Sequence, residues 1–145
     1  MSKNHDSMPV TLLDQLHTTG AGYDVIRYIG LPDIFGQESP TLLYFMGKNL
    51  SRKLDIQTVS DVVYAFDKLG WGQLELVKEK KNELIFQLMA DSVVYRLNAP
   101  LYTDFRLEAG FLSESIERIK ERSCECKEEL YEKIHQIEFT VVFTD

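Results

Sequence analysis

The sequence predicts an α+β protein in which helices pack against a small antiparallel sheet. Three observations support this prediction. Apolar residues recur at helical spacing through much of the first 70 residues, alternate with polar residues between residues 72 and 90, and alternate again near the C-terminus. No repeat or interdomain linker separates these parts, and 145 residues is an ordinary size for one domain. We therefore expect residues 1–145 to form a single domain, with residues 1–9 as a loose N-terminus.

The first two predicted helices are short. Residues 10–16, VTLLDQL, are expected to form one helix, which ends at HTTGAG. Residues 23–36, YDVIRYIGLPDIFG, are expected to form a second helix that ends at Gly30 and Pro32, because proline disfavours helical backbone at the residue before it. The side of this helix expected to be buried consists of Val25, Ile26, Tyr28 and Ile29.

Two stronger helices follow. In residues 38–55 the apolar positions at helical spacing are Leu43, Met46, Leu50 and Leu54. Gly47 lies among them and costs about 1 kcal/mol relative to alanine in a helix, so it indicates close packing of another element. In residues 58–70, Thr58 is a candidate N-cap and Gly70 a natural C-cap. The apolar face of this helix consists of Val59, Val62, Val63 and Phe66.

The pattern then changes from helix to strand. GQLELVKEK (residues 72–80) and NELIFQLMA (residues 82–90) flank a polar turn and predict an antiparallel hairpin. DSVVYRLNAP, ending at Pro100, predicts a short helix. The chain ends in QIEFTVVFTD, which predicts a half-buried strand. The apolar faces of the two later strands are Leu84, Phe86 and Leu88, and then Ile137, Phe139, Val141 and Phe143.

Both cysteines lie in residues 108–130, EAGFLSESIERIKERSCECKEEL, which we predict to be one long helix. At about 100° per residue, Cys124 and Cys126 would point to nearly opposite sides of it. The two sulfur atoms could then neither bind one metal ion nor form an ordinary disulfide. The three histidines, His5, His17 and His135, have no ligand spacing to either cysteine. We therefore expect no metal site.

The same helical spacing places one narrow apolar stripe along the predicted helix. It runs through Leu112, Ile116, Ile119, Ser123, Cys126, Leu130 and Ile134. The favoured interpretation is that this stripe packs on the sheet of its own domain. The other interpretation is a heptad-like seam against a second copy of the chain, although three heptads are few and Ser123 and Cys126 are weak seam residues. The sequence leaves both interpretations open.

The composition is that of a globular protein, with 44% hydrophobic and 27% charged residues. The net charge of −7 argues against a nucleic-acid partner or an anionic membrane surface, because phosphates attract cationic patches. The first ten residues lack an apolar signal segment, and no apolar run approaches the length of a membrane span. Two cysteines do not make a disulfide framework. We expect a cytoplasmic protein with no membrane span.

Motifs for catalysis are not found in the sequence. LGWGQL (residues 69–74) contains glycines, but it follows a helix and precedes a strand, the reverse of the order in phosphate-binding loops. There is no nucleophile elbow and no His-Glu-x-x-His run. Asp104, Glu108 and Glu114 could converge, but carboxylates near a helix start are usually solvated and favourable to the helix dipole. An enzyme is therefore the less favoured class, and no cofactor is expected.

Large aromatic residues are the most informative remaining set. Most of them are expected in the core, although such a set can also line a ligand cavity. Large rings near glycines are the best candidates for pocket walls. The candidate pocket residues are Tyr44, Phe45, Trp71, Phe86, Tyr95 and Phe111.

Four phrases, in this order, resemble the uncharacterised YslB family of Gram-positive bacteria across nearly the whole chain. They are YDVIRYIGLPDIFGQE, LLYFMGKNLSRKL, LGWGQLELV and FRLEAGFLSESI. A wider pattern is similar to the superfamily that contains vinyl-reductase-type sensor domains and TRAPP transport-complex subunits. This pattern has three parts. A Gly-x-x-Leu helix corresponds to Gly47 and Leu50, a Leu-Gly-x-Gly turn to Leu69, Gly70 and Gly72, and a Gly-Phe-Leu helix to Gly110, Phe111 and Leu112.

This resemblance implies a TRAPP-subunit-like α+β domain, often dimeric through its helices. Sensor-type relatives hold small aromatic molecules, and TRAPP subunits can hold an acyl chain in an apolar tunnel. Sensor-type relatives also carry a zinc-binding cysteine set after the long helix, where this chain has only Glu121, Cys124 and Cys126. The resemblance thus gives a second reason to expect no zinc. A shared fold does not carry an activity with it.

The leading hypothesis is a non-catalytic, homodimeric domain that binds a small hydrophobic or acyl ligand. The alternative is a protein–protein adaptor with a filled core, which works through its acidic, helical surface without a small ligand.

Overall fold

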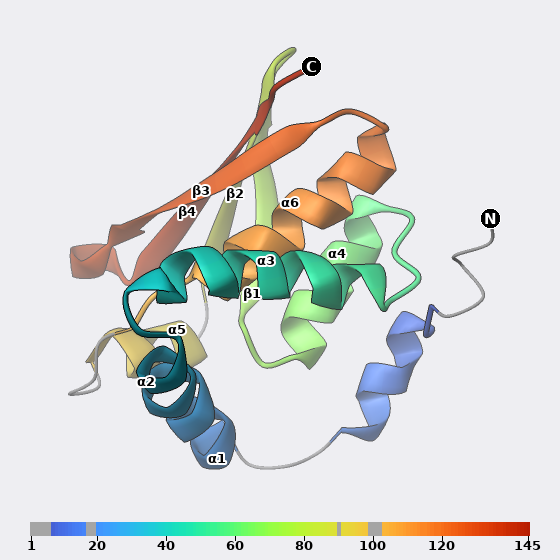
Figure 1. Cartoon of the computed structure of the whole chain (residues 1–145). Helices are drawn as coiled ribbons and strands as arrows, with labels where there is room; N and C mark the ends of the chain where they lie inside the picture. The colour runs from blue at the N-terminus through green and yellow to red at the C-terminus, as the bar shows by residue number, and fades with distance from the viewer. Residues whose placement is uncertain (1–6, 17–19, 90, 99–102) are drawn as a thin grey trace.

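The structure, a computed structural model, describes residues 7–16, 20–89, 91–98 and 103–145 (Figure 1). It is an α+β domain, as predicted, built on a four-stranded antiparallel sheet with strand order β1-β2-β4-β3. The strands are β1 (Gln73–Glu79), β2 (Glu83–Met89), β3 (Cys124–Tyr131) and β4 (Gln136–Phe143). The helices are α1 (Gly20–Val25), α2 (Leu31–Phe35), α3 (Ser39–Arg52), α4 (Val59–Lys68), α5 (Asp91–Asn98) and α6 (Arg106–Lys120).

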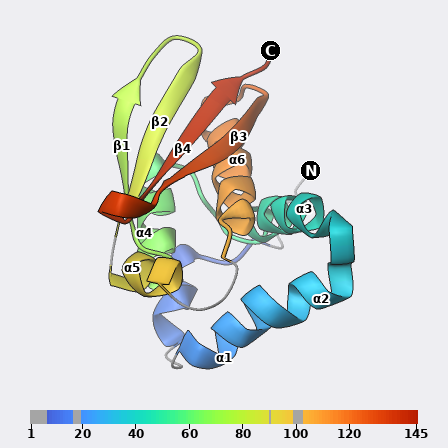
Figure 2. The same cartoon turned by 90° about the vertical axis from the view of Figure 1, so that its left-hand side faces the viewer.

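The sheet turns one face toward α4 and α6, and this face forms the core, while α3 packs against α6 (Figure 2). β2 and β4 are the central strands, and Phe86 lies directly opposite Phe139 across them. The predicted hairpin, the short helix α5 and the C-terminal strand are confirmed. The inward side chains of the two central strands are fully buried, namely Leu84, Phe86, Leu88, Ile137, Phe139 and Val141.

The prediction of one long helix through both cysteines is wrong. Helix α6 ends at Lys120, Glu121 adopts a left-handed conformation (φ 53°), and the chain turns back as strand β3. Cys124 and Cys126 therefore point to the same, inner face of a strand, instead of to opposite sides of a helix. The physical reason is that their spacing is also an alternation of period two, in which Glu125 and Lys127 face water.

A second correction concerns the N-terminal helical segment. Residues 20–35 form one continuous helical arm, in which α1, a π-helical turn (Ile26–Gly30) and α2 follow each other without a break. Gly30 and Pro32 were predicted to end the helix, but proline is tolerated at the first turn of a helix, and here it lies within the first two residues of α2. We call residues 20–35 the arm.

The backbones of helices α3 and α6 touch where the two helices cross. A Cβ atom on Gly47 would lie 2.0 Å from the carbonyl oxygen of Leu107, and one on Gly110 would lie 1.9 Å from that of Tyr44. Only glycine allows the two backbones to come so near. The prediction that Gly47 marks close packing of another element is confirmed, and that element is α6.

The remaining predicted features of the first half are confirmed in part. Thr58 caps α4 and, together with Asp61, forms a capping box, and Gly70 follows the helix at φ 78°. Residues 10–16 contain a 3-10 helix (Val10–Gln15), a tighter form than an α-helix. Met8 lies within the N-terminus expected to be loose, but it pairs with Leu54. Residues 1–6 and Pro100, the predicted end of the short helix, lie outside the described residues.

We predict that Gly47→Ala destabilises the protein by about 3 kcal/mol or more, because a methyl group must push two helix backbones apart. Urea denaturation would measure this change. Gly22→Ala is the matched control, because nothing lies within 4 Å of the added Cβ and Gly22 is also helical. The free energy of unfolding of this control should rise by up to about 1 kcal/mol. Equal, small effects for both variants would contradict the close crossing.

Candidate functional site

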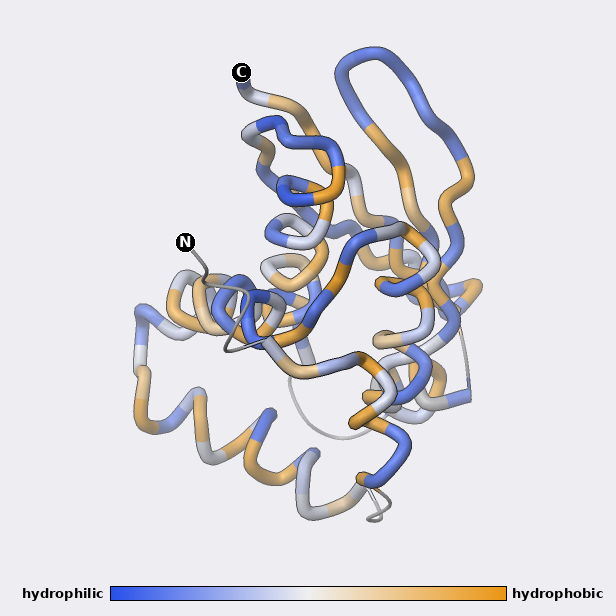
Figure 3. Tube along the Cα trace, turned by 90° about the vertical axis from the view of Figure 1, so that its right-hand side faces the viewer, coloured by the Kyte–Doolittle hydropathy of each residue, from blue (hydrophilic) through white to orange (hydrophobic). Residues whose placement is uncertain are grey.

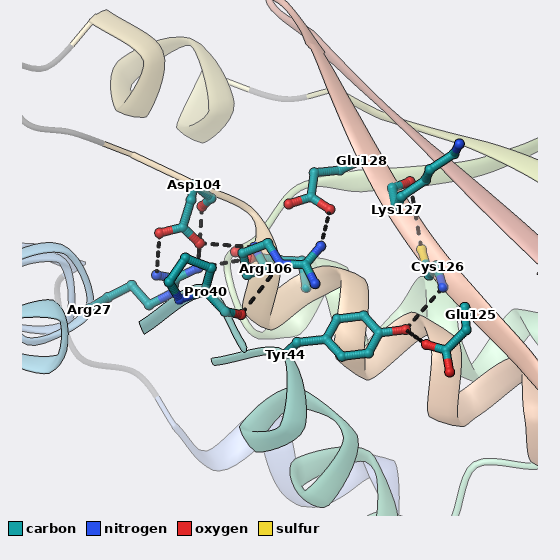
Figure 4. A network of polar contacts seen from close by, with 10 residues as sticks. Arg27, Pro40, Tyr44, Asp104, Arg106, Glu125, Cys126, Lys127 and Glu128 are labelled. Carbon is teal, nitrogen blue, oxygen red and sulfur yellow. Dashed lines mark hydrogen bonds and ion pairs between the residues drawn. The ribbon is translucent and has the colours of Figure 1, made fainter. Parts of the chain in front are cut away.

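The arm meets the body of the domain at a buried cluster of charges (Figure 4). Arg27 extends from the π-helical turn, and its side chain is 0% exposed. Its Nη2 atom lies 2.9 Å from Oδ1 of Asp104 and 3.2 Å from Oε1 of Glu108. The two carboxylates belong to the start of α6, 77 and 81 residues further along the chain.

Local structure positions these carboxylates. Asp104 precedes α6 and accepts a hydrogen bond of 2.9 Å from the backbone N–H of Arg106. Glu108 lies in the first turn of α6, where a negative charge is favourable to the helix dipole. From the sequence, Asp104, Glu108 and Glu114 were predicted to be solvated, with convergence as the alternative. Asp104 and Glu108 instead converge on Arg27, whereas Glu114 forms a separate ion pair of 3.1 Å with Arg52.

Arg27 remains charged in this position. Burial alone would lower the pKa of its guanidinium, but the charges of Glu108 and Asp104 and the hydrogen bond to Asp104 outweigh burial and raise the pKa. Its Nε atom has no hydrogen-bond partner among the described residues. A buried ion pair adds little net stability, yet removing one member of it is costly, because the other charge stays buried. The cluster therefore fixes where the arm attaches.

A second polar contact joins the arm to the body. The indole N–H of Trp71 donates a hydrogen bond of 3.2 Å to the hydroxyl of Tyr23. The Trp71 ring packs edge-on against Phe66 and Phe111, with ring centres 5.1 and 5.2 Å away. Tyr23 is thus connected through Trp71 to the centre of the aromatic core.

A polar network beside the junction protects the edge of strand β3 (Figure 4). The hydroxyl of Tyr44 donates to Oε1 of Glu125 at 2.7 Å and accepts from the backbone N–H of Cys126 at 3.0 Å. Arg106 stacks 4.6 Å from the centre of the Tyr44 ring and pairs with Glu128 at 2.8 Å. Part of the free edge of β3 is therefore already occupied by groups of the same chain.

The structure places the six candidate pocket residues at different depths. Trp71, Phe86 and Phe111 are buried in the core, and Tyr44 is nearly so. Phe45 on α3 is 54% exposed and Tyr95 on α5 is 74% exposed. Trp71 contacts Phe111, and Tyr44 contacts Phe45, each edge-on. The rings therefore belong partly to a packed core and partly to the surface.

The seven stripe residues do not lie on one helix. Leu112, Ile116 and Ile119 lie on α6, and Cys126 and Leu130 lie on β3. These five contribute to the core of their own chain, with Ile119 and Leu130 partly buried at its margin. The other two are exposed: Ser123 lies between α6 and β3, and Ile134 lies in the 3-10 turn after β3.

The two thiols are free and shielded. Sγ of Cys124 donates to the carbonyl oxygen of Ser113 at 3.3 Å, and burial raises the pKa of this thiol to about 11. Burial also raises the pKa of Cys126 well above its usual range. Both thiols are therefore protonated and weakly nucleophilic near neutral pH. Within the described ranges, histidine, cysteine and acidic residues form no group of three or more that could hold a metal ion.

Hydrophobic residues recur along the trace of the arm (Figure 3), and several of them are exposed to water. Val25, Ile26, Tyr28 and Ile29 were predicted from the sequence to be buried, but of these four only Tyr28 is. In the sequence, apolar residues occur at positions on both sides of the arm. This distribution was the signal that could have indicated an exposed apolar face. The exposed set is Tyr23, Val25, Ile26, Ile29 and Ile34. No helix in the described part of the chain is long and apolar enough to cross a membrane.

Fold and site define a single α+β domain with a helical arm held by a buried ion pair. The chain matches the family described as "Protein of unknown function (DUF2507)" over residues 20–142, and it belongs to that family. It is 33% identical to "Uncharacterized protein YslB" of Bacillus subtilis over 129 residues, which cover 89% of this chain and 87% of the relative. The resemblance to the YslB family is thus confirmed.

The chain is also similar to a more distant relative and to a solved structure. "Uncharacterized protein MJ1642" of Methanocaldococcus jannaschii is 25% identical over 103 residues, covering 70% of this chain and 62% of the relative. A crystal structure of a vinyl-4-reductase family protein from the same organism superposes with a TM-score of 0.63 at 17% identity, covering 94% of this chain and 88% of that one. The expected similarity to the vinyl-reductase-type fold is therefore confirmed.

We predict that Arg27→Met destabilises the protein by about 3–5 kcal/mol, because Glu108 and Asp104 lose the charge that balances them. Chemical denaturation would measure the loss, and limited proteolysis would test whether the arm detaches. The double variant Arg27→Met, Glu108→Gln should recover part of the loss, because it leaves one fewer buried charge. A loss below about 1 kcal/mol in the single variant would mean that the cluster does not hold the arm.

Proposed function

We propose that this chain is a non-catalytic interaction domain, the adaptor class, which binds a protein partner through the outer face of the arm. One observation carries the proposal. Three large apolar side chains on the outer side of this short segment, Val25, Ile26 and Ile29, are 48 to 59% exposed. Single exposed apolar residues are normal, whereas a contiguous patch is typical of an interaction site; the largest patch on a monomer, about 300–600 Å², is often functional.

The distribution of apolar residues around the arm supports this proposal. Its inner side holds Arg27 and Tyr28, which the body buries. Its outer side carries Val25, Ile26 and Ile29 and should be polar if only water faced it. A helix that is apolar on both sides is normally covered on both sides. A partner protein is the simplest cover.

We propose that the partner is a second copy of the chain, so that the two copies form a homodimer. Each copy carries a net charge of −7, so most faces of two copies repel each other. The arm's one cation, Arg27, is buried and balanced by Asp104 and Glu108, and its outer face is dominated by uncharged side chains. Two arms could pack face to face about a two-fold axis, each presenting the same patch.

A non-catalytic role agrees with the chemistry of the buried groups. Protonated thiols at Cys124 and Cys126 are poor nucleophiles, and Arg27 is committed to its two carboxylates. Free thiols also suit the cytoplasmic location that we propose, because disulfides are rare in that compartment.

We predict that the double variant Ile26→Ser, Ile29→Ser weakens self-association at least tenfold, because two central apolar contacts are lost. Sedimentation at several concentrations would measure it. Ile134→Ser is the matched control, because Ile134 is 59% exposed, the same as Ile26, but lies on the turn after β3. Both proteins should stay folded. A monomeric wild-type protein would overturn the homodimer, and an unchanged double variant would place the interface elsewhere.

A small hydrophobic or acyl ligand is the second candidate. The observation that favours it is the contact between Tyr23 and Trp71, because a movement of the arm would expose the end of the aromatic core. We predict that denaturing extraction of freshly purified protein, followed by mass spectrometry against a mock preparation, yields a near-stoichiometric hydrophobic compound if this candidate is right. Trp71→Leu should then lower its yield. An empty extract would favour the interaction domain.

A further inference from the structure

Helix α3 carries a second exposed apolar face. Leu42, Phe45 and Leu50 are 41 to 54% exposed, and Met46, which lies between them, is half-buried. At about 100° per residue, these four side chains and Lys53 at the end of the helix fall within roughly 140° of its circumference. The other side of α3 packs on α6. The five residues, which we call the α3 face, therefore present apolar side chains and one cation to water.

The cation of the α3 face is available to a partner. Residues 39–53 contain three basic residues and no acidic one, in a chain whose net charge is −7. Lys48 and Arg52 form ion pairs with carboxylates of α6. Lys53 belongs to no ion pair among the described residues. Asp55, the acidic residue nearest to Lys53 in the chain, accepts a hydrogen bond from an amide side chain instead.

The outer side of the arm carries the opposite charge. Asp33 is exposed and follows Ile29 by four residues, so it lies on the same side of the arm. No ion pair between described residues includes Asp33. Two arms packed on each other would bring no cation to it, because Arg27 is buried against two carboxylates. Burying an unpaired charge is costly, so the surface that covers the arm should supply a cation.

We propose that the arm of each copy packs on the α3 face of the other copy, with Asp33 beside Lys53 of the partner subunit. This inference rests on the proposed homodimer and identifies the surface that receives the arm. Ile26 and Ile29 of the arm meet the apolar side chains of the α3 face, and the one acid of the outer side meets the one base. A two-fold axis repeats the contact, so that each copy gives one arm and receives one.

The size of a stable interface also favours two elements on each copy. A specific interface uses about 20–30 residues on each side, which is more than the outer side of residues 20–35 supplies. The arm leads into α3 through the bend at residues 36–38 (Figure 2). The arm and the α3 face therefore belong to neighbouring parts of the chain, and one interface can include both.

The test is the self-association of the full chain, measured by sedimentation at several concentrations. Lys53→Glu should weaken it about tenfold, because the two-fold axis places an acidic side chain beside Asp33 twice. The double variant Lys53→Glu, Asp33→Lys should return to within about twofold of the wild-type protein, because the charges again match. The matched control is Lys81→Glu, an exposed lysine in the turn between β1 and β2, which changes the net charge equally. Its association should change less than about twofold.

The apolar part of the α3 face has its own variant. Phe45→Ser should weaken self-association about tenfold or more, because the largest exposed side chain of this face is lost. An unchanged Tm would show that each variant remains folded.

Four outcomes would overturn the inference. If Lys53→Glu and Phe45→Ser associate normally while Ile26→Ser, Ile29→Ser does not, the arm meets another surface, and the proposed homodimer stands without the α3 face. Equal weakening by Lys81→Glu would mean that association responds only to net charge. A double charge reversal that associates as poorly as Lys53→Glu alone would mean that the two charges do not face each other. A monomeric wild-type protein would overturn the homodimer and this inference with it.

Discussion

The contact between the backbones of α3 and α6 is the constraint on which the rest of the domain depends. Gly47 and Gly110 allow the two helices to touch without intervening side chains. Because α3 lies so close, nearly every side of the first half of α6 is buried. The buried hydroxyl of Ser115 therefore needs a hydrogen-bond partner, and it lies 2.8 Å from the hydroxyl of Ser51. Arg118 then donates to the carbonyl oxygens of Ser51 and Leu54, at the C-terminal end of α3.

That same crossing determines where charge can be placed. It holds the start of α6 deep in the molecule, so that the carboxylate of Glu108 is buried and requires a cation. Arg27 supplies that cation from a segment that otherwise contacts the body sparsely. The arm is thus attached by an interaction that is directional and costly to break, and not by a broad apolar contact. Its apolar side chains are left for other contacts.

Local patterns in the sequence predicted the elements whose signals are local. Thr58 with Asp61, the alternation in β2 and β4, and the lone glycine at position 47 each have a physical meaning within a few residues. The prediction was wrong at Cys124 and Cys126. Cys126 and Leu130 are four residues apart, a spacing that keeps two side chains on one face of a helix and also on one face of a strand. The stop at Glu121 uses a left-handed non-glycine residue, which carries no recognisable signal. The pairing of Arg27 with Glu108 spans 81 residues and has no local signature at all.

The aromatic side chains form a packed group in the core of this protein. Phe66 contacts Trp71, Phe111 and Phe139 edge-on, and Trp71 contacts Phe111. Such packing contributes stability and leaves little freedom to rearrange, except at the end where Trp71 reaches Tyr23 of the arm. The feature that stability does not explain lies outside this core, in the exposed apolar residues of the arm. A surface that lowers stability and has no structural role indicates selection for binding.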